Sequence, residues 1–196
     1  MTNKFLLLLF LSVFSSGAFS QNGSVEKRSQ AYLVSSGDTR PALSRPRIVK
    51  TVADKNAVGN YKKDYHLERQ VFDLINQQRI QIGLTTLEWN DEIAEIAREH
   101  SENMANSKFF SHTDLQGLMV NDRADALGFK KWRAIGENIA YNRGYENPAK
   151  SAVEKWMQSP AHRENLLNNR WRESGIGIAV TADGTYYFTE VFLLRK

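Results

Sequence analysis

The sequence predicts an α+β domain, with helices first and a β-hairpin at the C-terminal end. Apolar residues recur at helical spacing through much of residues 66–167, whereas the end of the chain is rich in β-forming residues around a turn signal. With 41% hydrophobic and 24% charged residues, the composition is that of a globular protein. Residues 64–196 have the length of one domain.

Five helices are expected from the apolar periodicity and from residues that favour helix ends. The first stops at Gly83, and the second follows Asn90, a residue type that caps helix N-termini. Pro148 fits the first turn of the fourth helix, because proline lacks the N–H that would have no partner there. The expected ranges are 66–82, 91–107, 118–127, 148–158 and 160–167.

A β-hairpin is expected after these helices. Residues 175–180 and 186–192 are rich in β-forming side chains and flank Ala182-Asp183-Gly184, which is typical of a hairpin turn. Between the first two helices, residues 84–89 are expected to form only a short connection. The large aromatic residues expected to anchor the core are Trp89, Trp156 and Phe192.

Residues 1–20 have the features of a secretory signal peptide. A single positive charge precedes the apolar residues 5–14, and small residues at Ala18 and Ser20 precede the expected cleavage site before Gln21. The apolar run is shorter than a transmembrane span, although an uncleaved signal would still act as a membrane anchor. We therefore expect a secreted protein, periplasmic or extracellular.

Residues 21–63 are expected to form a polar, basic linker. This segment has no sustained apolar period and carries most of the positive charge, so that residues 64–196 are net negative. The sequence pI near 9.3 therefore does not indicate nucleic-acid binding by the domain. The linker is expected to be either a solvated connection or a tether to an anionic envelope surface. Membrane association is expected only through this linker or through an uncleaved signal peptide. The protein is expected to be a monomer.

The absence of cysteine limits the possible chemistry. Disulfides, metal–thiolate sites and cysteine nucleophiles are excluded, so that a metal site must use His, Asp or Glu. The sequence also lacks a Gly-x-Ser-x-Gly nucleophile motif and a glycine-rich phosphate loop. No enzymatic reaction can be assigned from these patterns.

Three residues are candidates for a functional site. His112 follows the second helix in a loop, His162 lies in the last helix, and Glu137 lies between them beside apolar residues. Two imidazoles and a carboxylate form either a divalent-metal ligand set or an acid/base pair, and their spacing alone leaves open whether they meet. His100 fits the apolar face of its helix and is expected to be a hydrogen-bonded core residue, whereas His66 is expected to be exposed.

Several short motifs, taken in order, resemble the CAP superfamily. This is the family of cysteine-rich secretory proteins, antigen 5 and pathogenesis-related 1 proteins, whose domain is also called SCP. The resemblance is to its cysteine-free secreted bacterial branch and covers about residues 66–194. The motifs are Asn76–Arg79, Gly83–Asn90, Phe110–Thr113, Gly136–Ile139, Trp156–Leu166, Gly175–Gly177 and Tyr187–Phe192.

The resemblance implies an α-β-α sandwich, in which a small antiparallel sheet is flanked by helices. It also implies that His112, Glu137 and His162 converge in a central cleft. The family usually has a glutamate at the position of Ser159, so this cleft is one negative charge short. Glu190 stands where the family usually has glutamine, and could replace part of that charge if its side chain points inward.

Members of this family are reported to bind zinc or other divalent ions through the two histidines, and some bind sterols or fatty acids. We therefore expect a binding module whose cleft, lined by His112, Glu137, Ser159 and His162, holds a divalent cation or small ligand, with an envelope component as a possible partner. His112 and His162 are the expected metal ligands. The alternatives are a metal-assisted hydrolase, with Glu137 and His162 as catalytic candidates, and a lipid or sterol carrier.

Overall fold

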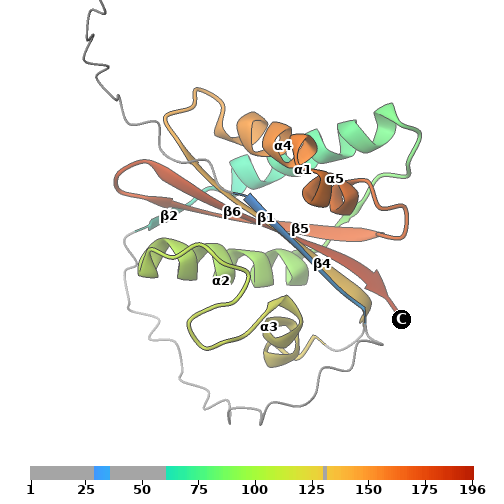
Figure 1. Cartoon of the computed structure of the whole chain (residues 1–196), viewed down its shortest axis with the longest axis horizontal. Helices are drawn as coiled ribbons and strands as arrows, with labels where there is room; N and C mark the ends of the chain where they lie inside the picture. The colour runs from blue at the N-terminus through green and yellow to red at the C-terminus, as the bar shows by residue number, and fades with distance from the viewer. Residues whose placement is uncertain (1–28, 36–60, 130–131) are drawn as a thin grey trace, which may run out of the picture.

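A computed structural model describes residues 61–129 and 132–196, and the backbone of residues 29–35. The expected signal peptide lies outside the described residues. The α+β class and the three-layer sandwich are confirmed: helices cover both faces of one sheet (Figure 1). Within the described residues, no helix is long and apolar enough to cross a membrane.

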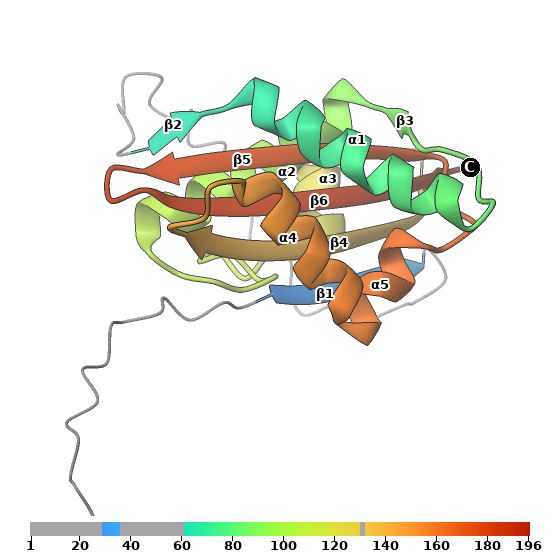
Figure 2. The same cartoon turned by 90° about the horizontal axis from the view of Figure 1, so that it is seen from above.

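The middle layer is a six-stranded sheet with the strand order β1-β4-β6-β5-β2, and Figure 2 shows these strands side by side. Neighbours in this order are antiparallel, and the short β3 adds to β5 in parallel. The strands are β1 (Ser29–Ser35), β2 (Tyr61–Lys63), β3 (Glu88–Trp89), β4 (Trp132–Arg143), β5 (Glu173–Thr181) and β6 (Thr185–Arg195).

Helices α1, α4 and α5 cover one face of the sheet, and α2 and α3 cover the other (Figure 1). Their bounds are α1 (Tyr65–Gln81), α2 (Asp91–Ser107), α3 (Val120–Ala126), α4 (Pro148–Gln158) and α5 (Pro160–Leu166). All five expected helices are present, the third being shorter than expected. The side chain of Asn90 accepts a hydrogen bond from the backbone N of Ile93 at 3.0 Å, and that of Asn147 from the backbone N of Lys150 at 2.9 Å.

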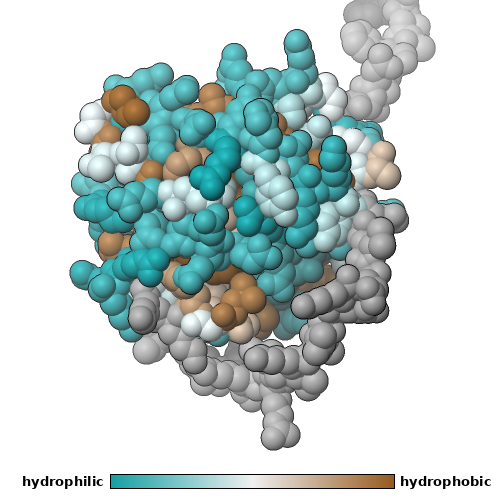
Figure 3. All heavy atoms as spheres, turned by 180° about the vertical axis from the view of Figure 1, so that it is seen from behind, coloured by the Kyte–Doolittle hydropathy of each residue, from teal (hydrophilic) through white to brown (hydrophobic). Residues whose placement is uncertain are grey.

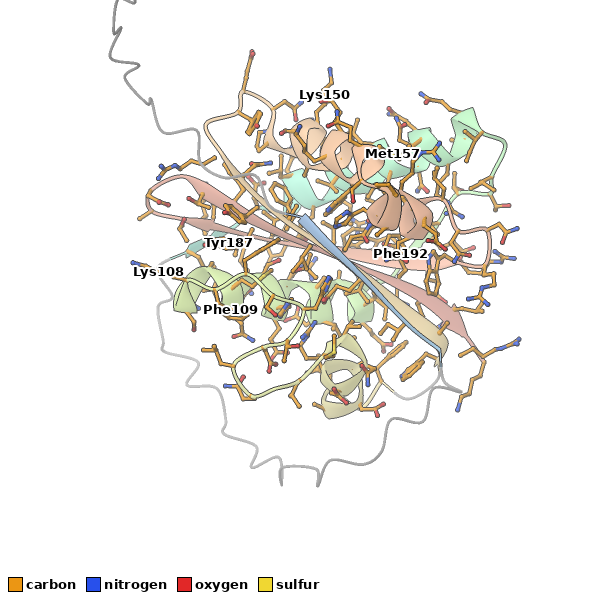
Figure 4. The ribbon with its side chains drawn as sticks, viewed as in Figure 1. Lys108, Phe109, Lys150, Met157, Tyr187 and Phe192 are labelled. Atoms are coloured by element: carbon orange, nitrogen blue, oxygen red, sulfur yellow. The ribbon has the colours of Figure 1, made fainter. Side chains whose placement is uncertain are left out.

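The core confirms two of the three aromatic anchors. Trp156 and Phe192 are fully buried in the layer beneath α1, α4 and α5, and Figure 4 shows Phe192 on β6 close to α5. Trp89 is only partly buried, so its expected place as a core anchor is wrong; it packs at the rim, with the guanidinium of Arg69 3.8 Å above its ring centroid. Trp171 is buried instead, with its ring centroid 5.7 Å from that of Phe192.

Helix α2 lies unusually close to β5. A Cβ atom on Gly177 would lie 2.1 Å from the backbone N of Arg98, and one on Gly175 would lie 2.2 Å from that of Ala94. Only glycine, which has no Cβ atom, permits this close contact between helix and strand. The Gly-Ile-Gly motif therefore sets the spacing between the sheet and the layer that includes α2.

Four strands, β1 to β4, were not expected, and β3 lies where only a short connection was expected. β4 lies between β1 and β6 and is covered on both faces, so its residues lack the alternation of a half-buried strand. β1 lies within residues 21–63, for which only a linker was expected, and so does β2. The expected linker thus contains two segments that pair with the sheet.

Candidate functional site

The candidate site is centred on Glu137, a fully buried residue of β4. Its Oε1 lies 2.6 Å from Nδ1 of His112, and its Oε2 accepts a hydrogen bond from Nη2 of Arg123. The three side chains come from β4, from the loop after α2 and from α3. A buried carboxylate is thus paired with one imidazole and one guanidinium.

The loop that presents His112 is fixed by hydrogen bonds on both sides of this residue. His100 donates from Nε2 to the carbonyl of Ser111 at 2.9 Å, and Arg123 donates from Nη1 to the carbonyl of His112 at 3.0 Å. His100 is confirmed as a buried, hydrogen-bonded core residue. Burial lowers the pKa of His100 to about 4, so it is neutral at neutral pH.

The ionisation of Glu137 decides the tautomer of His112. Burial alone would raise the pKa of Glu137, but the charge of Arg123 and the hydrogen bond with His112 outweigh it and lower this pKa to about 2. An ionised carboxylate can only accept hydrogen bonds, so Nδ1 of His112 is the donor. In neutral His112 the lone pair is then on Nε2, as in histidines that bind metals and are oriented by a carboxylate.

His162 approaches β4 from the other face of the sheet. It is buried on α5, and its carbonyl accepts a hydrogen bond from Nδ2 of Asn138 at 3.2 Å. Asn165 donates to the Oδ1 of Asn138 at 3.0 Å. Because neighbouring residues of a strand point to opposite faces, Glu137 faces His112 while Asn138 faces α5. The structure thus brings His112 and Glu137 into contact and places His162 on the opposite side of the same strand.

Ser159 lies partly buried at the junction of α4 and α5 and contributes no charge. Glu190 does point into the interior, where its Oε1 accepts a hydrogen bond from Ser174 Oγ at 3.0 Å. However, burial raises the pKa of Glu190 to about 8, despite this bond and the charge of Arg79. Glu190 is therefore mostly protonated at neutral pH and does not replace the missing negative charge.

A cation does not fit all the candidate residues equally. In the described part of the chain, no three His, Asp or Glu side chains are placed to hold one metal ion. Both carboxylate oxygens of Glu137 are engaged by His112 and Arg123, so Glu137 does not fit as a ligand. The imidazole of His112 does fit, because Glu137 orients it through Nδ1, whereas His162 lies on the opposite side of β4.

Aromatic side chains line the sheet beside the His112 loop. The ring centroid of Phe110 lies 4.9 Å from that of Tyr141, and Tyr141 stacks on Tyr187 at 5.9 Å. All three are partly buried. Figure 4 shows Tyr187 above the end of α2, where Lys108 and Phe109 lie. These rings pack the loop against β4 and β6.

A cavity of about 470 Å³ lies elsewhere, between α2, the end of α3 and the end of β6. Its lining includes charged side chains, so it does not resemble an apolar lipid site. Figure 3 shows one face of the molecule that is mostly hydrophilic with scattered hydrophobic residues. The residues that line the cavity are Glu92, Glu95, Ile96, Leu127, Gly128, Phe129 and Arg195.

With the fold and site described, comparison with known proteins identifies the family. The sequence profile of the cysteine-rich secretory protein (CAP) family matches residues 72–192. The chain belongs to the CAP family. The resemblance proposed from the motifs is thus confirmed, and the lack of cysteine fits the bacterial branch of CAP domains.

Two relatives of this chain come from Bacillus subtilis (strain 168). YlbC, described as an uncharacterized membrane protein, is 40% identical over 128 residues, and the uncharacterized protein YkwD is 31% identical over 110 residues. The alignments cover 65% and 56% of this chain but only 34% and 41% of these relatives. The chain thus spans less than half the length of either relative.

Two solved structures have the same fold. An extracellular protein with an SCP domain from Bacillus anthracis is 29% identical with a TM-score of 0.58, over 66% of this chain and 41% of that one. An outer surface protein from Borrelia burgdorferi has a TM-score of 0.61 at 22% identity, over 70% of this chain and 99% of that one. The second likeness shows the fold alone.

Arg123 is the part of the site that sequence reasoning missed. It is buried, and it contacts both Glu137 and the loop that presents His112. In the sequence it is one polar residue of a short helix, with no motif around it. Its position three residues after Val120, which is buried on the same helix, was the one local sign that it could face the interior.

Proposed function

We propose that this CAP domain is a secreted binding module that holds a divalent cation or small ligand at the pair formed by His112 and Glu137. The observation that carries the proposal is the contact of His112 Nδ1 with the ionised Glu137, which directs the Nε2 lone pair away from the carboxylate. His112 would bind the cation through Nε2, and Glu137 would orient this imidazole. His162 approaches β4 from the other face and stays a predicted second ligand. The bound cation would supply a positive centre for an anionic or carbonyl ligand.

The proposed location is outside the cytoplasm. The expected signal peptide supports it, and so does the likeness to the extracellular protein from Bacillus anthracis. YlbC is described as a membrane protein, which agrees with the alternative in which an uncleaved signal or the basic linker associates with a membrane. In either case we propose an envelope component as the partner.

The hydrolase alternative has less support in the geometry. A metal-assisted hydrolase needs a general base beside the attacking water, with a pKa near the working pH. Glu137 has a pKa of about 2, and both its oxygens are engaged. A lipid carrier has less support still, since the cavity has charged lining residues and lies apart from His112 and His162.

Zinc titration calorimetry on the chain from Gln21 onward tests the proposal. We expect binding near pH 7.5 that is lost in the double variant His112→Ala/His162→Ala and weakens below about pH 6.5, where free imidazoles become protonated. His66→Ala is the matched control, because His66 is exposed on α1, away from the site. Binding that survives in the double variant, or no binding in the native chain, would overturn the cation proposal.

The substitution Ser159→Glu sharpens this test. Ser159 precedes His162 by three residues at the start of α5, so a carboxylate there would lie near this predicted second ligand. We expect tighter zinc binding, by about 10-fold, since metal ligands and their partners typically contribute this much. Ser159→Gln is the control of equal size without charge, and equal affinities of the two variants would count against a cation near α5.

A further inference from the structure

The outer edge of β4 is covered by β1, a strand from the N-terminal part of the chain. The seven residues of β1 pair antiparallel with Ala134–Ala140, and Tyr32 stands opposite Glu137 in the register. Figures 1 and 2 show β1 at the edge of the sheet, beside α5. β1 therefore lies along the part of β4 that carries the centre of the candidate site.

β1 is an addition to the CAP domain rather than part of its matched core. The family profile begins at residue 72, well after β1. β1 pairs with β4, which begins only at Trp132, so the two strands are not joined by a hairpin turn. The antiparallel pairing with β4 uses backbone groups, and another extended segment running in the same direction can form the same ladder.

We propose that the β4 edge from Ala134 to Ala140 is a binding site for an extended, uncharged peptide segment of another protein, and that β1 competes for it within the chain. An uncovered strand edge presents a row of backbone N–H and C=O groups and is a template for strand addition. The resident segment, Ser-Gln-Ala-Tyr-Leu-Val-Ser, has no charged residue and a β-forming centre, which defines the kind of partner.

The edge also offers two different surfaces to the side chains of a bound segment. Successive side chains of a strand point to opposite faces. A residue opposite Glu137 would share the face of His112 and Arg123, whereas its neighbours in the segment would share the face of α5. The side chains next to this edge can thus select a sequence, while the backbone supplies the pairing. This inference goes beyond the proposed function and does not require a cation.

Disulfide capture at single introduced cysteines tests the site and its register. The chain has no cysteine of its own, so Ala134→Cys and Ala140→Cys each provide one thiol. In the β1 register, Ser35 faces Ala134 and Ser29 faces Ala140. A synthetic peptide with the β1 sequence and cysteine in place of its last serine should be captured by Ala134→Cys, and one with cysteine in place of its first serine by Ala140→Cys.

The experiment uses the chain from Gln21 onward, in a thiol–disulfide buffer with EDTA, and mass spectrometry counts the mixed disulfides. We expect matched pairs of cysteines to be captured at least about 10-fold faster than mismatched pairs, since pairing raises the local concentration of the thiol. Both alanines are about equally buried, so each position controls for the accessibility of the other. Equal capture by matched and mismatched peptides, or no capture at all, overturns the proposal.

Proline pairs in β1 test whether it competes. In β1, the backbone N–H groups of every second residue point toward β4. Proline has no N–H, so only one of two double variants removes N–H groups that pair with β4. These variants are Ala31→Pro/Leu33→Pro and Gln30→Pro/Tyr32→Pro. We expect the variant that loses these N–H groups to capture the matched peptide about 10-fold faster, because β1, as an attached segment, otherwise competes at high effective concentration. The other variant should change the capture rate little. Zinc affinity is measured in parallel, so failure of the cation proposal leaves this test intact. Unchanged capture in both variants would overturn the competition by β1.

Discussion

Glu137 and Glu190 are both fully buried glutamates on neighbouring strands, yet their ionisation is opposite. Glu137 accepts hydrogen bonds from Arg123 and His112, and its pKa is about 2. Glu190 accepts a hydrogen bond from Ser174, and its pKa is raised to about 8. At neutral pH one is a carboxylate and the other is mostly a carboxylic acid.

This difference teaches that the partners, and not burial, decide the charge of these two side chains. Burial raises the pKa of each, but of the two only Glu137 forms an ion pair with a guanidinium within the described residues, and this contact outweighs burial. A buried ion pair is weak evidence for stability, whereas an ionised group that orients a histidine serves a site. We therefore assign the candidate site to Glu137 and a structural role to Glu190.

The largest effect is expected from Arg123→Met, which leaves the charge of Glu137 buried without its cationic partner. Breaking one side of a buried ion pair typically costs about 3–5 kcal/mol, so we expect a loss of this size in the free energy of unfolding at pH 7. Urea unfolding in EDTA measures it. The double variant Arg123→Met/Glu137→Gln should recover part of the loss, and a single variant as stable as the native chain would show that Glu137 is not ionised.

A smaller effect of opposite sign is expected from Glu190→Gln. The folded pKa of about 8 lies above the usual glutamate value of 4.5, so native stability from this group is full below about pH 4.5 and is lost as the pH rises toward 8. A glutamine side chain does not titrate, and the variant should be more stable by about 3 kcal/mol at pH 7 and nearly unchanged at pH 4.5. A gain that does not grow with pH would contradict the raised pKa.

The pH dependence of Glu137 has the opposite direction. Its folded pKa of about 2 lies below the usual value, so its stabilisation is present above about pH 4.5 and is lost as the pH falls toward 2. The difference in stability between the native chain and Glu137→Gln should therefore shrink over this acid range. Urea unfolding at several acid pH values measures this, and a constant difference would mean that Glu137 keeps an ordinary pKa.

The smallest effect is expected from Ser174→Ala. It removes the hydrogen bond to Oε1 of Glu190, which is worth about 1 kcal/mol at a buried site. The cost should depend on pH, since the bond favours the charged form of Glu190, and it should differ in the Glu190→Gln background. Thermal unfolding of both single variants and the double variant measures this coupling, and strictly additive effects would show that the two side chains do not interact.

Local signals made the helices predictable. Asn90 and Asn147 accept backbone hydrogen bonds at the helix starts that their residue type indicates, and α4 begins at the expected Pro148. β4 was missed because helices cover both its faces and remove the alternation of polar and apolar residues. β1 was missed because its pairing depends on a distant strand rather than on a nearby turn.

The candidate site was only partly predictable. His112, Glu137 and His162 were singled out by residue type, but their grouping came from the family resemblance, because they lie far apart in the sequence. The ion pair of Arg123 with Glu137 depends on packing between α3 and β4, which no local pattern reveals. The ionisation of Glu190 depends on how deeply it is buried and on which charges lie near it, and both are settled only by tertiary structure.

The central claim is that ionised Glu137 holds His112 with its proton on Nδ1. Nitrogen-15 NMR of histidine-labelled protein tests it directly, because the chain has only four histidines and His112→Gln assigns the signal. At about pH 7.5 in EDTA we expect His112 to show a protonated Nδ1 and an unprotonated Nε2. In Glu137→Gln this preference should weaken. A His112 protonated on Nε2 in the native chain, or a tautomer unchanged by Glu137→Gln, would contradict the account.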